Sequence, residues 1–332
     1  MLGIGLIIPL LTVFMNEDIS NNLITFDILN NLNQTQIIFV LLALITIIYF
    51  FKIIFLALMV FLQNKYSFDI YKKNSSYLLE LYMHKGILFF SNTNSSTLIR
   101  NVLSECNLFS FGVIFNILQL ASSVVIGFAI CITLIIIEPT GSILTLLCFT
   151  FFGILIFKST NKMIYNWGVI RQKQSSLVIK NLQEIFMGIK EIIIYSAEKL
   201  SLEKFKNNNA EASKVGLYRN TVVQLPRLIL ELIGVVSFSL LIIFLINFNK
   251  NFDEILIILG VFVLATVRLL PNISKIVKSF QEIKFNLPTI NLLDKELSEY
   301  YFLQNEIKKK KKVPKILDFR NISFNNVGYN YK

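Results

Sequence analysis

Long apolar runs constrain the fold of this 332-residue chain more than any other feature of its sequence. Five runs approach the ~20 residues that an α-helix needs to cross a bilayer, and they cover residues 37–62, 111–137, 142–157, 228–248 and 255–270. A sixth run, 2–14, lacks the basic flank and cleavage pattern of a signal peptide and looks like the outer half of a further span. With 54% hydrophobic residues and a mean hydropathy of +0.62, the sequence predicts an all-α membrane protein with six transmembrane helices.

The basic residues between these runs predict how the helices are oriented. Lys and Arg number five in 63–110, eleven in 158–226 and twelve after Pro271, whereas the other connections together hold only Lys250. Because Lys and Arg collect in the cytoplasmic loops of membrane proteins, we expect a multi-pass protein of the inner (plasma) membrane with both termini cytoplasmic. The same asymmetry accounts for the net charge of +11, and no nucleic-acid partner is expected.

The two long cytoplasmic loops, 63–110 and 158–226, repeat apolar residues at spacings of three and four. This spacing predicts amphipathic helices. Two helices of about twenty residues in each loop would extend the membrane helices by ~30 Å into the cytoplasm. The chain would turn back in the polar cluster Ser91–Thr97 and near Gly188.

Cysteine and histidine offer no metal site and no catalytic site. Cys106, Cys131 and Cys148 show neither a disulfide framework nor ligand spacing, and His84 is the only histidine. We therefore expect reduced cysteines, a structural histidine and no catalytic residue in this chain.

Four charged residues lie in the apolar runs or at their edges, and these are Lys52, Arg227, Glu231 and Arg268. By the helical rise, Lys52 and Arg268 lie about 22 and 20 Å from the outer ends of their spans, and Arg227 lies near the inner interface. A charge at the bilayer centre costs ~2.5–3.5 kcal/mol on insertion scales and usually faces a bundle interior or a water-filled cavity. We interpret the four as binding residues for an anionic substrate, because a guanidinium matches phosphate oxygens. Snorkelling of Lys52 and Arg227, or local pairing of Arg227 with Glu231, is the alternative.

Short segments of the chain resemble a known family of membrane transporters. "GIKEIIIYSAEKLSLEKF", residues 188–205, is similar to the second coupling-helix region of type I exporters among the ABC transporters. "ISFNNVGYNY", residues 322–331, is similar to the first strand of their ATPase domain. Two further segments, "QLPRLILELIG" at 224–234 and "RLLPNISKIVKSFQEIKF" at 268–285, look most like PglK-type flippases of lipid-linked oligosaccharides.

The resemblance implies how the chain is divided into domains. Residues 1–290 would form the transmembrane domain, 291–315 a linker, and 316–332 the first strand of a truncated ATP-binding domain in which Tyr331 stacks on adenine. ATP and Mg²⁺ would bind the missing part of that domain, because the sequence contains no GxxxxGK[ST] phosphate loop and no LSGGQ-type signature. Binding of the linker lysines to anionic lipid is an alternative role for the linker.

The resemblance also implies partners for this chain. We expect a domain-swapped homodimer and an ATP-binding domain that is either fused or encoded separately. The surface that couples to this domain would contain Asn92, Asn94, Gly188, Lys190 and Glu191.

The function implied by the resemblance is the transmembrane pathway of an ATP-driven exporter or flippase. Its substrate would be a polyprenyl-diphosphate-linked oligosaccharide or a similar anionic amphiphile, moved by alternating access. An ABC exporter of peptide, drug or glycolipid is one alternative. A non-transporting truncated remnant or membrane scaffold is another.

Overall fold

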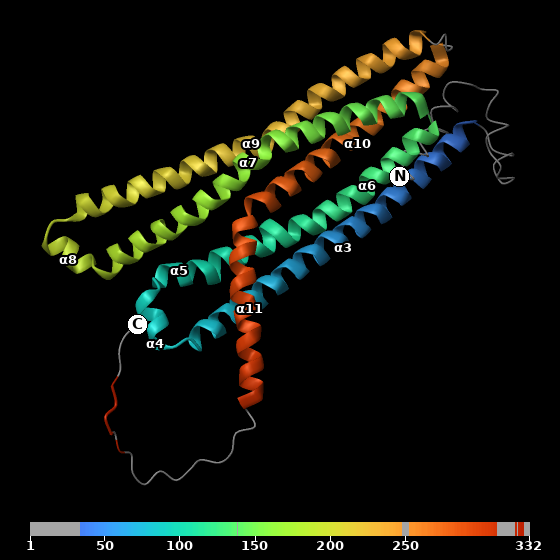
Figure 1. Cartoon of the computed structure of the whole chain (residues 1–332). Coiled ribbons are helices and arrows are strands. Elements are labelled where there is room, and N and C mark those ends of the chain that lie inside the picture. Colours follow the sequence, from blue (N-terminus) through green and yellow to red (C-terminus); the bar gives the residue numbers. More distant parts are fainter. Residues whose placement is uncertain (1–33, 138, 248–251, 311–322, 324, 329–332) are drawn as a thin grey trace.

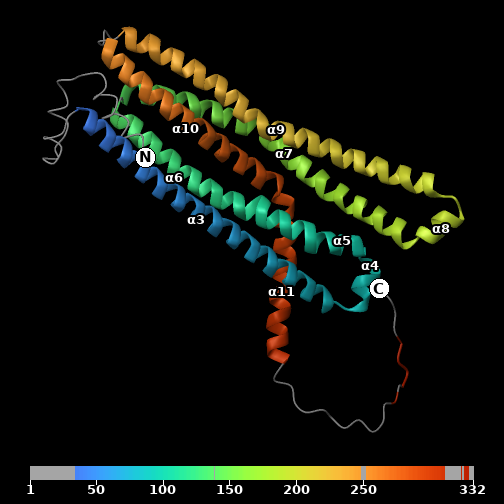
Figure 2. The same ribbon diagram turned by 180° about the vertical axis from the view of Figure 1, so that it is seen from behind.

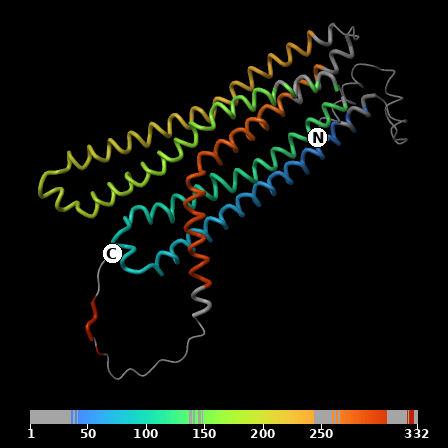
Figure 3. Tube along the Cα trace, in the orientation of Figure 1, coloured from blue at the N-terminus to red at the C-terminus, as the bar shows by residue number. Residues whose placement is uncertain are grey.

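The computed structural model describes residues 34–137, 139–247, 252–310, 323 and 325–328 (Figure 3). Within these residues the chain consists of helices joined by short turns and contains no strand, so the predicted all-α class is confirmed. The predicted span at 2–14, Tyr331 and most of the predicted first strand at 316–332 lie outside the described residues.

Three helices are much longer than a bilayer is thick. α3 spans Gln34–Met83, α7 spans Pro139–Met187 and α9 spans Glu198–Asn247. At ~1.5 Å per residue each of them measures about 75 Å, against a hydrocarbon core of ~30 Å. Each apolar run therefore continues unbroken into the amphipathic segment beside it, as the spacing of apolar residues predicted.

Shorter elements turn the chain and complete the bundle. They are α4 (Ile87–Asn92), α5 (Ser95–Arg100), the π-helical stretches η3 (Asn101–Glu105) and η4 (Leu108–Ile114), α6 (Phe115–Ile137), α8 (Ile189–Ile194), α10 (Phe252–Phe285) and α11 (Leu287–Lys310). α3 ends at Met83, earlier than the predicted turn at Ser91–Thr97, which contains the end of α4 and the start of α5, whereas the turn predicted near Gly188 lies at the start of α8.

The long helices form two groups, α7 with α9 and α3 with α6, which lie close together at one end of the molecule and separate toward the other (Figures 1 and 2). α7 packs along α9, and α6 packs along α10. α10 also contacts α7 and α9, and so joins the two groups. α11 runs at an angle to the other helices. It contacts α3, and both views show it crossing α3 and α6.

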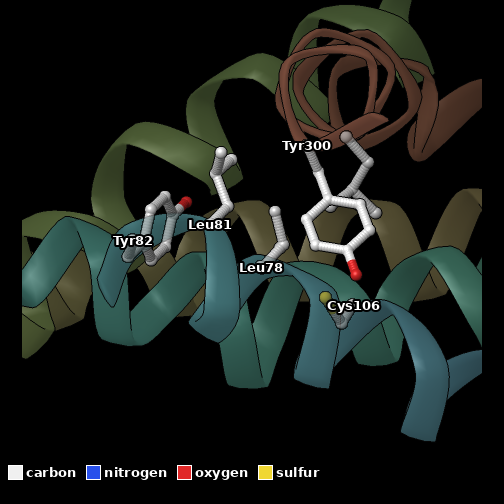
Figure 4. Close-up of a cluster of buried hydrophobic side chains, with 6 residues drawn as sticks. Leu78, Leu81, Tyr82, Cys106 and Tyr300 are labelled. Carbon is white, nitrogen blue, oxygen red and sulfur yellow. The ribbon is translucent and has the colours of Figure 1, made fainter. Parts of the chain in front are cut away.

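The core is divided between the bundle and the crossing of α11. In the bundle, Ile130 of α6, Leu241 of α9 and Phe262 of α10 belong to one buried cluster. A separate cluster holds α11 against α3, and it contains Leu78, Leu81, Tyr82, Cys106, Leu293 and Tyr300 (Figure 4). α11 is therefore packed as an integral part of the fold.

Two glycines allow the junction between α10 and α11 to approach its neighbours closely. α10 ends at Phe285, and the following residue, Asn286, is buried. A Cβ atom at Gly168 of α7 would lie 2.1 Å from the carbonyl oxygen of Phe285. A Cβ atom at Gly112 of η4 would lie 2.4 Å from Nδ2 of Asn286. The absence of a side chain at both glycines is what admits the junction.

Three helices of the described chain are long and apolar enough to cross a membrane, not the six that we predicted, and they cover Leu42–Met83, Ser95–Ile136 and Glu198–Ile243. The runs 142–157 and 255–270 do lie within α7 and α10. Both runs are shorter than the ~20 residues that a bilayer requires, and several of their side chains lie outside the described part of the chain. The structure thus supports a membrane protein with at least these three spans.

Candidate functional site

Lys52 and Arg268, which are far apart in the sequence, meet at one aromatic ring. The ring belongs to Tyr49, one turn before Lys52 in α3. The Lys52 Nζ atom lies 4.7 Å from the ring centroid, and the guanidinium carbon of Arg268 lies 5.7 Å from it. Nη2 of Arg268 also donates a hydrogen bond to the Tyr49 hydroxyl. Cations at these distances are attracted by the aromatic ring, so Tyr49 is a shared neighbour of two positive charges.

No carboxylate neutralises either cation within the described part of the chain. Arg268 is half-buried and Lys52 is exposed in the isolated chain. A guanidinium has five N–H donors, and among the described residues Arg268 has the Tyr49 hydroxyl as its hydrogen-bond acceptor. The remaining donors of Arg268 and the ammonium of Lys52 can therefore bind the oxygens of an anion.

Arg227 and Glu231 do not join this cluster. They pair with each other along α9, with 3.1 Å between Nε of Arg227 and Oε1 of Glu231. Both side chains are exposed, at 75% and 49%. This is the local i,i+4 pair that the sequence offered as the alternative interpretation. An exposed pair of this kind contributes ~0.3–0.5 kcal/mol in water, and it leaves neither charge free.

Tyr49 is a candidate site residue that the sequence analysis missed. Its signal was present in the i,i+3 spacing to Lys52, which places both residues on one face of a helix. That spacing does not reveal Arg268, because only the packing of the bundle brings α10 to this point of α3. Pro271, which follows Arg268 by three residues, lies inside the continuous helix α10.

The predicted coupling residues lie at two tips of the bundle. Asn92 is the last residue of α4 and Asn94 is the N-cap of α5, and both side chains are exposed. Gly188 is the N-cap of α8, and Lys190 and Glu191 are exposed in the first turn of that helix. Figures 1 and 2 show α4 and α8 at separate tips.

Both tips expose large apolar side chains. At the α8 tip, Ile194 and Tyr195 are 75% and 80% exposed. At the α4 tip, Ile87 is 88% exposed. Ser196 ends α8 in the left-handed region with φ of 53°, which turns the chain sharply into α9. Exposed apolar groups at the ends of long rigid helices are suited to contact with a partner.

A buried ion pair ties three elements together below the membrane runs, and sequence analysis did not single it out. Glu105 of η3 is fully buried. Nη1 of Arg171 in α7 lies 3.0 Å from Oε1 of Glu105, and the Thr289 hydroxyl of α11 donates to Oε2 at 2.6 Å. Nη2 of Arg171 also donates to the Thr289 hydroxyl at 2.8 Å. The carboxylate therefore fixes η3, α7 and α11 relative to one another.

Glu296 is a half-buried acidic residue of α11. Its Oε2 atom is buried and has no hydrogen-bond partner. Burial raises the pKa of Glu296 above its ordinary value, and the nearby Lys85 ammonium opposes this shift. Tyr300, one turn further along α11, donates to Oε2 of Glu80 at 2.9 Å, and burial raises the pKa of Tyr300 to about 12. Tyr300 is therefore a neutral donor at physiological pH.

The described residues contain no candidate metal site. They contain no group of three or more His, Cys, Asp or Glu side chains that could hold a metal ion. The whole sequence lacks a GxxxxGK[ST] motif, whose backbone amides and lysine cradle phosphates.

A known protein family matches most of the chain. Residues 3–269 match the ABC transporter transmembrane region. The match includes both short tip helices and the Lys52, Tyr49 and Arg268 cluster, while α11 follows it. The chain therefore belongs to the family of ABC transporter transmembrane regions.

Proposed function

We propose that this chain forms the membrane pathway of an ATP-driven exporter or flippase whose substrate is an anionic amphiphile. The observation that carries the proposal is the meeting of Lys52 and Arg268 at Tyr49 without a carboxylate among the described residues. Two cations held together in a surrounding of low dielectric are costly. An anion that neutralises both of them is therefore bound in preference to a neutral or cationic molecule.

The substrate class that we propose is a polyprenyl-diphosphate-linked oligosaccharide. Its diphosphate offers several acceptor oxygens, which match the fork of donors on Arg268 and the point charge of Lys52. Its polyprenyl chain would stay in the hydrocarbon of the membrane. Arg227 and Glu231, already paired with each other, would take no part in binding this headgroup.

Transport by this proposal requires partners. Transmembrane regions of ABC exporters normally dimerise and pair with an ATP-binding domain. We propose that a second copy of this chain completes the pathway and that ATP and Mg²⁺ bind to the ATP-binding domain, fused or separate. The tips at α4 and α8 would contact that domain, and its closure would switch access to the pathway. We propose that the chain is oriented as the loop charges predict, with both termini on the cytoplasmic side of the inner membrane.

The proposal is tested by binding to the full chain in phosphatidylcholine nanodiscs. Undecaprenyl diphosphate, the neutral undecaprenol and a cationic amphiphile of similar chain length are titrated separately. We expect the diphosphate to bind at least ~10-fold more tightly than the alcohol, because hydrogen bonds to charged groups are worth roughly 1.5–3 kcal/mol each. Equal affinities for the diphosphate and the alcohol would contradict the proposed substrate class.

An exporter of peptide, drug or glycolipid is the second candidate, and one observation favours it. The Arg227 and Glu231 pair shows that a charge in these helices can be neutralised locally, without any substrate. This candidate predicts that the cationic or neutral amphiphile binds as tightly as the diphosphate. A membrane scaffold without transport function predicts saturable binding of none of the three.

A further inference from the structure

A side-chain hydrogen bond ties α10 to α6 one turn beyond Arg268. Nδ2 of Asn272 in α10 donates to the backbone carbonyl of Ser123 in α6 at 2.8 Å, and Asn272 is only 6% exposed. Gly127, one turn after Ser123, leaves room for this amide, because a Cβ atom at Gly127 would lie 3.0 Å from Nδ2. A buried polar side chain that is bonded to the backbone of a neighbouring helix fixes the register of the two helices.

This register bears on Arg268 because α6 lies between α10 and α3. α10 packs along α6, α6 contacts α3, and both views show the three helices in this order (Figures 1 and 2). Arg268 and Asn272 are four residues apart, so they lie on one face of α10 at a distance of about 6 Å along its axis. Arg268 donates to the Tyr49 hydroxyl of α3. The position of α10 on α6 therefore sets how the Arg268 side chain reaches Tyr49.

α10 is weakened between Arg268 and Asn272 by a proline. Pro271 lies inside the helix. It has no N–H to donate to the carbonyl of Val267, one turn earlier, and its ring crowds that carbonyl. Helices bend at such positions. Asn272 directly follows Pro271, so its bond to Ser123 holds α10 where the hydrogen-bond ladder of the helix is interrupted.

We propose that Asn272 is a positioning residue for the cluster of Lys52, Tyr49 and Arg268. By anchoring α10 to α6 beside Pro271, Asn272 holds Arg268 at the Tyr49 ring. Asn272 acts through Arg268 and is not itself a substrate ligand. Its effect on substrate affinity rests on the proposed function, whereas its effect on the placement of Arg268 does not.

The placement of Arg268 can be measured without a substrate. The full chain, labelled with fluorinated tyrosine and held in phosphatidylcholine nanodiscs, gives a fluorine NMR signal for Tyr49, which Tyr49→Phe identifies by its loss. Arg268→Ala removes both the charge and the hydrogen bond from Tyr49, and so defines where this signal lies without them. We expect Asn272→Leu to move the signal toward that position in the original chain, and to cause no further movement in the Arg268→Ala background.

Two further variants accompany Asn272→Leu. Gly127→Ala crowds the amide of Asn272 and should move the Tyr49 signal in the same direction by a smaller amount. It replaces Asn272→Leu where circular dichroism shows that the leucine variant is unfolded. Asn116→Leu is the matched control, because Asn116 is also buried but its amide donates to carbonyls four and five residues earlier in the chain. It should leave the signal unchanged.

Affinity shows what this placement does for the proposed substrate. We expect Asn272→Leu to weaken the binding of undecaprenyl diphosphate roughly 3- to 18-fold, as the loss of one hydrogen bond between helices allows. In the Arg268→Ala background it should have no further effect, because the two changes remove the same interaction. Normal binding by Arg268→Ala would contradict the proposed function, and the NMR signal would still decide the role of Asn272.

Two results would overturn the inference. One is a Tyr49 signal that Asn272→Leu and Gly127→Ala leave in place, or that Asn116→Leu moves as far. The other is an equal weakening of affinity by Asn272→Leu in the original chain and in Arg268→Ala, because a general loss of structure would affect both alike.

Discussion

At the scale of single residues, Tyr49 gives the two cations Lys52 and Arg268 a shared partner. The ring lies within cation–π distance of both charges, and its hydroxyl accepts a hydrogen bond from the guanidinium of Arg268. A cation pair that is held by an aromatic ring remains available to an anion, because the ring carries no charge that would neutralise it. If these cations bind the proposed substrate, the identity of residue 49 should therefore affect its affinity.

Two substitutions of Tyr49 distinguish the contribution of the ring from that of its hydroxyl. Tyr49→Phe keeps the aromatic face but loses the hydrogen bond to Arg268, and one neutral hydrogen bond contributes roughly 0.5–1.5 kcal/mol. We expect the affinity for undecaprenyl diphosphate to fall by ~2- to 12-fold in the nanodisc titration, and further in Tyr49→Ala. Tyr66→Phe, on an exposed part of the same helix, is the control. An unchanged affinity in Tyr49→Ala would show that the ring does not organise the site.

Glu296 predicts a pH dependence of stability. Its pKa is raised in the folded chain by burial, so the folded state favours the protonated carboxyl. The stabilisation that this gives is complete below the ordinary pKa of 4.5 and is lost as the pH rises through the raised value. Glu296→Gln should therefore melt at a higher temperature than the original chain at pH 7, and the difference should vanish toward pH 4.5. A lower melting temperature of Glu296→Gln at pH 7 would contradict this account.

At the scale of elements, the junction between α10 and α11 is closely packed against η4 and α7. Gly112 and Gly168 admit it, and Glu105 holds α11 beside it through Thr289. π-helical turns often mark functional sites, and η3 and η4 both lie along this junction. These contacts therefore link α11 directly to α7 and to η4, which continues into α6.

A methyl group at Gly168 should disturb this junction. Its Cβ atom would lie 2.1 Å from the Phe285 carbonyl oxygen, a distance that requires the backbone to shift. Overpacking of this kind costs ~1–3 kcal/mol, so Gly168→Ala should lower the melting temperature of the purified chain. Gly153→Ala, at a position with open space, should have no such effect. Equal melting temperatures of the two variants would show that the close approach does not exist.

Removing the charge of Glu105 should be more damaging than removing an exposed charge. The change Glu105→Gln leaves Arg171 without its carboxylate in a buried setting, and breaking a buried pair costs ~3–5 kcal/mol. Glu184→Gln provides the control, because Glu184 is exposed and pairs with Lys204 at 3.0 Å, and such pairs contribute ~0–1 kcal/mol. Urea unfolding followed by circular dichroism compares the two. A smaller loss of stability in Glu105→Gln than in Glu184→Gln would be inconsistent with the buried network.

The sequence predicted elements better than contacts. Apolar runs and spacings of three and four predicted the long helices, because these patterns reflect local geometry. Gly188 predicted the turn before α8, whereas the polar cluster Ser91–Thr97 placed the first turn after the point where α3 ends, at Met83. The ion pair between Glu105 and Arg171 was not predicted, because both residues lie in segments that the sequence predicts as solvated amphipathic helices. Only the structure shows that Thr289 of α11 contacts both side chains. The number of spans was predicted less well, since sixteen-residue runs such as 142–157 fall short of a full crossing.

At the scale of the whole molecule, the tips at α4 and α8 lie far from the cluster of Lys52, Tyr49 and Arg268. Rigid helices of about 75 Å connect the apolar tips at α4 and α8 with the membrane runs. Such helices transmit a displacement at one end to the other, which suits the coupling role proposed for residues such as Asn92 and Lys190. The family membership was accessible from the sequence, whereas the partner of Arg268 required the packed bundle.

The central claim is that Arg268, held by Tyr49 beside Lys52, binds the anionic head of the substrate. The most direct measurement compares the affinity of undecaprenyl diphosphate for the full chain and for Arg268→Ala in phosphatidylcholine nanodiscs, with Arg227→Ala as the matched control. Our account predicts a roughly 10- to 100-fold weaker affinity for Arg268→Ala, a nearly unchanged affinity for Arg227→Ala, and normal folding of both variants. An affinity of Arg268→Ala equal to that of the unmodified chain would contradict it.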